Sequence, residues 1–169
     1  MHKIRLLNAK DRSRIYEIMQ QDDILTAFEI DFTIEQIDNF LFENNKLKNK
    51  AIVIENDNCR VIGFGYYGPN DVIRDSFIIY RFYLSSIYDD NTLADELISF
   101  IEKDINSKHI RKIYMALTSK ISNKKLQFYK KHNYIKEKIQ KDFYKKGKDL
   151  VLLEKDLNST LNTIDYIQN

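Results

Sequence analysis

The stretch Phe77-Ile-Ile-Tyr-Arg-Phe-Tyr-Leu84 decides the fold of this chain, because its β-branched and aromatic residues favour a β-strand at the centre of a sheet. After a short polar segment that follows Leu84, the spacing of apolar residues changes from that of a strand to that of a helix. Apolar residues then recur every four positions, as on one face of an amphipathic helix: Leu93, Leu97, Ile101 and Ile105. The two patterns together predict a central strand that leads through a loop into a helix.

The residues before this strand predict one strand, two helices and a hairpin. Residues 4–6 alternate between apolar and charged, which is typical of a short strand. A first helix follows the polar segment 8–11, and a second is expected to begin at Thr33, because Thr33-x-x-Gln36 has the form of a capping box. Residues 51–55 and 60–67 then predict two antiparallel strands around a turn.

The residues after the helix predict a strand, a helix and a second hairpin. The strand covers Ile113–Leu117, and the short helix covers Ser122–Lys131. Tyr134–Glu154 reads as a hairpin with Gly147 near its turn. The full order of expected elements is therefore β-α-α-β-β-β-α-β-α-β-β.

The length and composition of the chain fit one soluble globular domain. A chain of 169 residues has the length of one domain, and its 43% hydrophobic and 31% charged residues exclude disordered and fibrous classes. No repeat or linker divides it. We therefore expect a single domain over residues 1–156 and a C-terminal tail, residues 157–169, whose apolar residues have helical spacing.

The numbers of cysteines and histidines and the lengths of the apolar runs exclude a metal site, a disulfide framework and a membrane span. Cys59 is the only cysteine, and the three histidines lack metal-ligand spacing, so no metal site is expected. No apolar run approaches the ~18 residues of a membrane span, and the polar N-terminus has no signal-peptide core. The expected localisation is cytoplasmic, with no membrane partner.

Residues 63–68 satisfy the dinucleotide-binding pattern Gly-x-Gly-x-x-Gly, but their context rejects that function. The pattern requires a helix directly after it, so that a pyrophosphate meets the helix N-terminus. Here Pro69-Asn70-Asp71 and another strand follow. The glycines are better explained by a strand that another segment approaches closely.

Charge is unevenly distributed although the net charge is only +2. Residues 15–45 carry eight acids and no lysine or arginine, whereas residues 120–148 carry eleven lysines and two acids. Runs of this kind are most often solvated surfaces. Read functionally, the acidic segment would attract a cation and the basic segment an anion.

Two segments carry longer patterns. In residues 82–94, Tyr88 and Ala94 fit Leu-x-Val-x-Pro-x-Tyr-(Gln/Arg)-Gly-x-Gly-x-(Gly/Ala). In residues 122–134, Phe128-Tyr129 and Tyr134 fit Asn-x-x-Ala-x-x-Phe-Tyr-x-x-x-Gly-Phe, with Asn133 in place of glycine. These patterns resemble the GNAT superfamily of N-acetyltransferases over about residues 3–156. The resemblance implies an α+β fold: a mixed, mostly antiparallel central sheet of six to seven strands, flanked by about four helices.

The resemblance further implies that acetyl-CoA is the co-substrate. Backbone N–H groups of the loop and helix start would hold its pyrophosphate, at positions occupied here by Asp89, Asp90, Asn91, Thr92, Leu93, Ala94 and Asp95. The pantetheine arm would pair with the strand at Phe82, Tyr83 and Leu84, and Ser122 and Phe128 belong to the same binding site. Tyr129 is the candidate general acid, because a phenol is protonated at neutral pH and can protonate a departing thiolate.

The acceptor implied by the resemblance is a small amine. Residues 62–69 and the pair Arg81-Phe82 are similar to bacterial spermine/spermidine acetyltransferases, so a polyamine is one expectation. The candidate acceptor-binding residues are Glu29, Asp31 and Tyr80. Some family members use a strand glutamate as the base, but that position falls near Ile78 here, which leaves a water chain or an acid such as Glu29 or Asp31.

Two other functions stay open at this point. Where the family has Gln or Arg and two glycines, this chain has residues 89–92, and the carboxylates of Asp89 and Asp90 would repel a pyrophosphate. The alternative is therefore a GNAT-fold binding module that has lost catalysis. Nucleic-acid binding through residues 120–148 is disfavoured, because that segment lacks arginine and the chain is nearly neutral. The oligomeric state is not fixed by the sequence, and a homodimer is one option.

Overall fold

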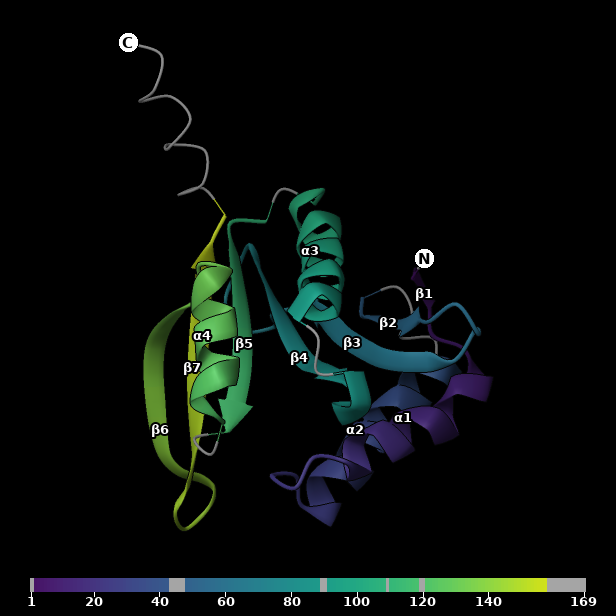
Figure 1. Cartoon of the computed structure of the whole chain (residues 1–169). Helices are drawn as coiled ribbons and strands as arrows, with labels where there is room; N and C mark the ends of the chain where they lie inside the picture. Colours follow the sequence, from purple (N-terminus) through teal and green to yellow (C-terminus); the bar gives the residue numbers. More distant parts are fainter. Residues whose placement is uncertain (1, 43–47, 89–90, 109, 119–120, 158–169) are drawn as a thin grey trace. The chain divides into compact units, whose positions relative to one another are not determined.

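The computed structural model describes residues 2–42, 48–88, 91–108, 110–118 and 121–157 (Figure 1). Seven strands and four α-helices follow one another there in the predicted order. The strands are β1 (Lys3–Leu6), β2 (Lys50–Glu55), β3 (Val61–Pro69), β4 (Ser76–Leu84), β5 (Lys112–Thr118), β6 (Ile135–Lys145) and β7 (Lys148–Asp156). The helices are α1 (Arg12–Gln20), α2 (Ala27–Phe42), α3 (Asn91–Asn106) and α4 (Asn123–Lys131), and the short 3-10 turns η1 (Ala9–Asp11) and η3 (Ser86–Tyr88) precede α1 and α3.

The strands form a seven-stranded sheet in the order β1-β2-β3-β4-β5-β7-β6, so β4 is its middle strand, as predicted. β4 and β5 pair in parallel, with Ser76–Ile79 opposite Lys112–Met115. The pairs β1–β2, β2–β3, β5–β7 and β6–β7 are antiparallel. The predicted α+β class with a mixed, mostly antiparallel sheet is confirmed.

The chain forms two compact units whose boundaries fall at the end of β3, within β4 and within α3. Unit 1 comprises residues 1–68 and 80–102, and unit 2 comprises residues 69–79 and 103–169. The single domain expected over residues 1–156 stays a prediction. Most of the expected C-terminal tail, residues 158–169, lies outside the described residues.

The core of unit 1 lies where α1 and α2 cover the strands β2 and β3. The apolar residues Ile15, Ile18 and Met19 of α1 are buried in a cluster with Phe64 and Tyr66 of β3. In Figure 1, α1 and α2 lie side by side, and the ion pair between Arg12 of α1 and Asp38 of α2 joins them (2.6 Å). The apolar face of each helix is therefore what attaches it to the sheet.

The glycines of β3 allow other segments to approach the strand closely, as predicted. A Cβ atom on Gly65 would lie 2.7 Å from Cδ1 of Ile101 in α3. A Cβ atom on Gly63 would lie 2.8 Å from the carbonyl oxygen of Tyr83 in β4 and would also clash with the Leu84 side chain. Residues 63–68 form a strand and not the turn into a helix that a dinucleotide site requires.

Helix α2 begins at Ala27, so the predicted start at Thr33 is wrong. The capping box is Thr26-x-x-Glu29: the backbone N–H and the hydroxyl of Thr26 both donate to the Glu29 carboxylate (2.8 and 2.7 Å). Thr33 is fully buried inside the helix, and its hydroxyl donates to the Glu29 carbonyl oxygen (2.8 Å). The buried residues Ile30 and Ile34 extend the apolar face of α2 to this earlier start.

None of the described helices is long and apolar enough to cross a bilayer.

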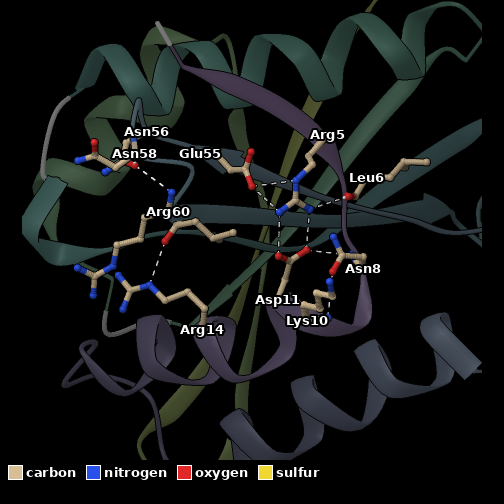
Figure 2. A network of polar contacts seen from close by, with 11 residues as sticks. Arg5, Leu6, Asn8, Lys10, Asp11, Arg14, Glu55, Asn56, Asn58 and Arg60 are labelled. Atoms are coloured by element: carbon tan, nitrogen blue, oxygen red, sulfur yellow. Dashed lines mark hydrogen bonds and ion pairs between the residues drawn. The ribbon is translucent and has the colours of Figure 1, made fainter.

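A network of charged side chains ties β1, η1 and β2 together in unit 1 (Figure 2). The Arg5 guanidinium donates to both carboxylate oxygens of Asp11 (2.7 and 2.9 Å) and to Glu55. Burial by itself would raise the pKa of Asp11, but hydrogen bonds from Arg5 and from the Asn8 backbone N–H outweigh it and lower this pKa. The positive charge of Arg5 is therefore neutralised inside the fold.

Unit 2 is built on the β6–β7 hairpin, β5 and α4. Gly147 has a φ of +77° at the hairpin turn, and Asn133 has a φ of 63° directly after α4, so both turn predictions are confirmed. On β7, the buried Glu154 accepts a hydrogen bond from the Tyr114 hydroxyl (2.8 Å) and pairs with Lys112 (2.8 Å). The negative charge of Glu154 is therefore neutralised within unit 2.

Candidate active site

The second half of β4 departs from regular strand geometry. The Tyr80 ring lies 5.5 Å from the Tyr66 ring, and the Tyr83 ring lies 5.6 Å from the Phe64 ring. Phe64 and Tyr66 are two positions apart on β3 and share one face, whereas residues three positions apart on a regular strand point to opposite faces. The alternation of β4 is therefore broken between Tyr80 and Tyr83, as a bulge would break it.

The turn between β4 and α3 is anchored to three other segments of unit 1. The Ser85 backbone N–H donates to the Ile62 carbonyl oxygen of β3 (2.7 Å), and its hydroxyl donates to the Gln21 side chain at the end of α1 (2.8 Å). The Tyr88 hydroxyl accepts a hydrogen bond from Asn56 in the β2–β3 turn (3.0 Å). This turn is therefore held in one position directly before the N-terminus of α3.

Helix α3 presents the backbone donors expected of an anion site. It begins at Asn91, and the first four N–H groups of any α-helix have no partner within the helix. Leu93 and Ala94 are buried, so their side chains belong to the core and only their backbone can contact a ligand. The predicted residues Asp89 and Asp90 lie outside the described residues.

The site residues predicted in unit 2 lie together on α4. Ser122 caps the helix by accepting a hydrogen bond from the Lys125 backbone N–H (3.3 Å). The Tyr129 ring is buried and lies edge-on to the rings of Phe128 (5.3 Å) and Tyr134 (6.2 Å). The Lys155 ammonium group of β7 lies over the Tyr134 ring, 5.6 Å from its centre. Packing thus fixes the orientation of Tyr129.

The two predicted acceptor-binding acids lie on different sides of α2. The Glu29 carboxylate caps the helix through its bonds to Thr26. Asp31 lines an open depression of about 320 Å³ between α1 and α2, together with Arg12, Tyr16, Ile34, Glu35 and Asp38. Tyr80, the third predicted acceptor residue, is half-buried on β4. Of these three residues, only Tyr80 belongs to the strand that carries the candidate site.

Arg81 is a candidate site residue that the sequence analysis named only in the resemblance of the pair Arg81-Phe82 and did not assign to the site. Its Nε donates to the Thr33 hydroxyl of α2 (2.6 Å), and its Nη1 donates to the Tyr80 carbonyl oxygen (2.6 Å). It is half-buried and lies beside Tyr66, whose pKa is raised by burial, although the bond from Asn49 and the Arg81 charge act in the opposite direction. Its significance depends on tertiary neighbours, which local sequence patterns do not contain.

Comparison with known proteins agrees with this geometry. A family model described as acetyltransferase (GNAT) domain matches residues 4–150. No curated protein sequence matches the chain significantly.

Several solved structures share the fold at low sequence identity. A protein assigned to the GNAT family from Desulfovibrio desulfuricans has a TM-score of 0.82 and 17% identity, over 92% of this chain and 99% of that one. A spermidine N-acetyltransferase SpeG chimera from Vibrio cholerae and hSSAT has a TM-score of 0.77 and 15% identity, over 95% and 98%. The ribosomal-protein-S18-alanine N-acetyltransferase from Escherichia coli has a TM-score of 0.73 and 11% identity, over 93% and 94%. These acceptors differ in kind, so the likeness establishes the fold and not the acceptor.

Proposed function

Because the chain belongs to the GNAT acetyltransferase family, we propose that it transfers an acetyl group from acetyl-CoA to a small amine. The observation that carries the proposal is the β4–α3 turn. It is anchored by Ser85 and Tyr88 and leads into a helix of 16 residues, Asn91–Asn106. A fixed turn before a helix N-terminus is a suitable support for the pyrophosphate of acetyl-CoA.

The residues proposed to bind the co-substrate lie on β4 and α3 in unit 1. In the proposal, backbone N–H groups at the start of α3 hold the pyrophosphate, and Phe82, Tyr83 and Leu84 of β4 hold the pantetheine arm. Thr92 lies in the first turn of α3 and Asp95 follows that turn, and both belong to the proposal by their position on the helix. Asp89 and Asp90 stay in the proposal by position only.

The proposed general acid, Tyr129, belongs to α4 of unit 2. The amine nitrogen attacks the thioester carbonyl carbon, a C–N bond forms, and the C–S bond breaks. The amine loses a proton to a base, and the leaving thiolate takes a proton from the Tyr129 phenol, which yields the amide and free CoA thiol. Ser122 and Phe128 complete this part by fixing the start of α4 and the Tyr129 ring.

The acidic depression on α2 is the feature that bears on a polyamine acceptor. The depression that contains Asp31 carries two further carboxylates, Glu35 and Asp38, and an acidic surface concentrates cations. Asp38 is already paired with Arg12, and Glu29 is used as a helix cap, which reduces the negative charge left for a ligand. Acceptor assays therefore need to include polyamines and also amines that carry a carboxylate group.

The proposal is tested by free thiol release from acetyl-CoA in the presence of a panel of amines. Tyr129→Phe is expected to lower kcat by about 10²- to 10⁴-fold, because it removes a general acid, and to leave the Kd for acetyl-CoA unchanged in calorimetric titration. Tyr114→Phe is the matched control: it removes a buried hydroxyl of the same unit, bound to Glu154, and should leave kcat unchanged. Equal turnover of Tyr129→Phe and the wild type would remove Tyr129 from the mechanism, and absence of acetyl-CoA binding would overturn the function itself.

A further inference from the structure

Three arginines of unit 1 are half-buried, and one of them differs from the others. Arg5 pairs with Asp11 and Glu55, and Arg14 pairs with Glu17 (2.7 Å). Arg81 has no carboxylate partner within the described part of the chain. Its Nε and Nη1 donate to uncharged oxygens, and its Nη2 makes no hydrogen bond or ion pair there.

A half-buried guanidinium group without a counter-ion is unfavourable in a folded protein, because burial removes part of its hydration. The two bonds that Arg81 makes orient the group without neutralising it. Thr33 accepts the bond from Nε and is fully buried. Its hydroxyl is itself fixed by its bond to the Glu29 carbonyl oxygen, so Thr33 fixes the orientation of the guanidinium group. Within the described residues, Nη2 and the second hydrogen of Nη1 make no hydrogen bond, and this end of a guanidinium group can bind a carboxylate through two parallel hydrogen bonds.

The acids of α2 do not neutralise Arg81. The Glu29 side chain is turned to the start of the helix, where it accepts two bonds from Thr26. Asp31 precedes Thr33 by two residues, which places it about 200° away around the helix, and it lines the depression shared with α1. The positive charge of Arg81 is therefore available to a molecule that binds beside β4.

From this arrangement we infer that the acceptor carries a carboxylate next to its amine, as an amino acid does, and that Arg81 binds the carboxylate. The inference rests on the proposed acetyl transfer and specifies its acceptor. Arg81 directly precedes Phe82–Leu84, the segment assigned to the pantetheine arm, and Tyr80 and Tyr83 belong to the same strand. A polycation would instead be repelled by the Arg81 charge.

The test compares acceptors that differ only in the carboxylate. Thiol release from acetyl-CoA is measured with the protein amino acids and with their decarboxylated amines, for example lysine against 1,5-diaminopentane. Within the best pair, wild-type kcat/KM should favour the amino acid by about 10- to 100-fold, the range of a charged hydrogen-bonded contact. Arg81→Gln should abolish this preference, and Arg81→Lys should keep part of it.

Thr33→Val tests whether the orientation of Arg81 matters. It removes the oxygen that orients Arg81 but keeps the guanidinium charge and the volume of the side chain, so it should weaken the preference for the amino acid without abolishing it. If Arg81→Gln changes kcat/KM for both members of a pair alike, or if it weakens acetyl-CoA binding in titration, Arg81 does not read the acceptor and the inference is overturned. Thiol release confined to decarboxylated amines overturns the inference alone, whereas no release with any acceptor overturns the proposed function and the inference with it.

Discussion

Two regions of unit 1 hold an arginine in different ways. Around Arg5, the carboxylates of Asp11 and Glu55 take up the positive charge, and the network joins β1, η1 and β2 (Figure 2). Around Arg81, the bonds go to the Thr33 hydroxyl and the Tyr80 carbonyl oxygen, and the charge is not compensated among the described residues. The Arg5 region therefore stabilises the fold. The Arg81 region is the one in which, by the inference above, a ligand supplies the missing negative charge.

The largest expected effect of this difference is on stability. Asp11→Asn should lower the free energy of unfolding by about 3 kcal/mol, because it leaves the half-buried Arg5 with one carboxylate instead of two. Asp38→Asn is the matched control in the same unit: its partner Arg12 is exposed, so the loss should stay below about 1 kcal/mol. Urea denaturation measures both values. Equal losses for the two variants would mean that the Arg5 network is no more than a surface ion pair.

The second expected effect is on the pH dependence of stability. The pKa of Asp11 is lowered in the folded protein, so its stabilising contribution is present above its unfolded value, ~3.9, and is lost as the pH falls through the lower folded value. The difference in unfolding free energy between the wild type and Asp11→Asn should therefore shrink below about pH 4. Denaturation series at pH 7, 5, 4 and 3 measure this difference. A difference that stays constant over the series would contradict a structural role for the ionised carboxylate.

The smallest expected effect is that of Arg81 on stability. Arg81→Gln should change the free energy of unfolding by less than about 1 kcal/mol, because it loses two bonds to neutral oxygens and also removes an uncompensated charge. The same urea series provides the measurement, with Asp11→Asn as the reference. A loss as large as that of Asp11→Asn would show that both arginines serve the fold, and the contrast between the two regions would disappear.

The sequence predicted the elements well because their signals are local. The four-residue repeat of Leu93, Leu97, Ile101 and Ile105 places these side chains on one buried face of α3 whatever else surrounds the helix. The turn at Asn133 depends only on the tolerance of asparagine for a positive φ. The start of α2 was missed because two segments, at Thr26 and Thr33, both have the capping-box form. Burial of Ile30 decided between them.

The sequence predicted which positions carry candidate site residues, but it predicted little about the side chains that surround them. Ser122, predicted as a co-substrate contact, caps α4, and Tyr129, predicted as the general acid, is held by its ring contacts. Glu29 was expected to attract a substrate, but tertiary structure turns it into a cap, since its partner is Thr26. Its role in binding, like those of Asp31 and Tyr80, stays a prediction.

By itself, the sequence determined the order of strands and helices and the family, because hydrophobic period, capping and turn residues act over a few positions along the chain. Only the tertiary structure decided which charges are compensated. Arg5, Asp11 and Glu55 come from three separate elements, and Arg81 meets Thr33 across 48 residues of chain. A charge is neutralised or left available by the atoms that surround it in space, and those atoms are chosen by packing and not by neighbours in sequence.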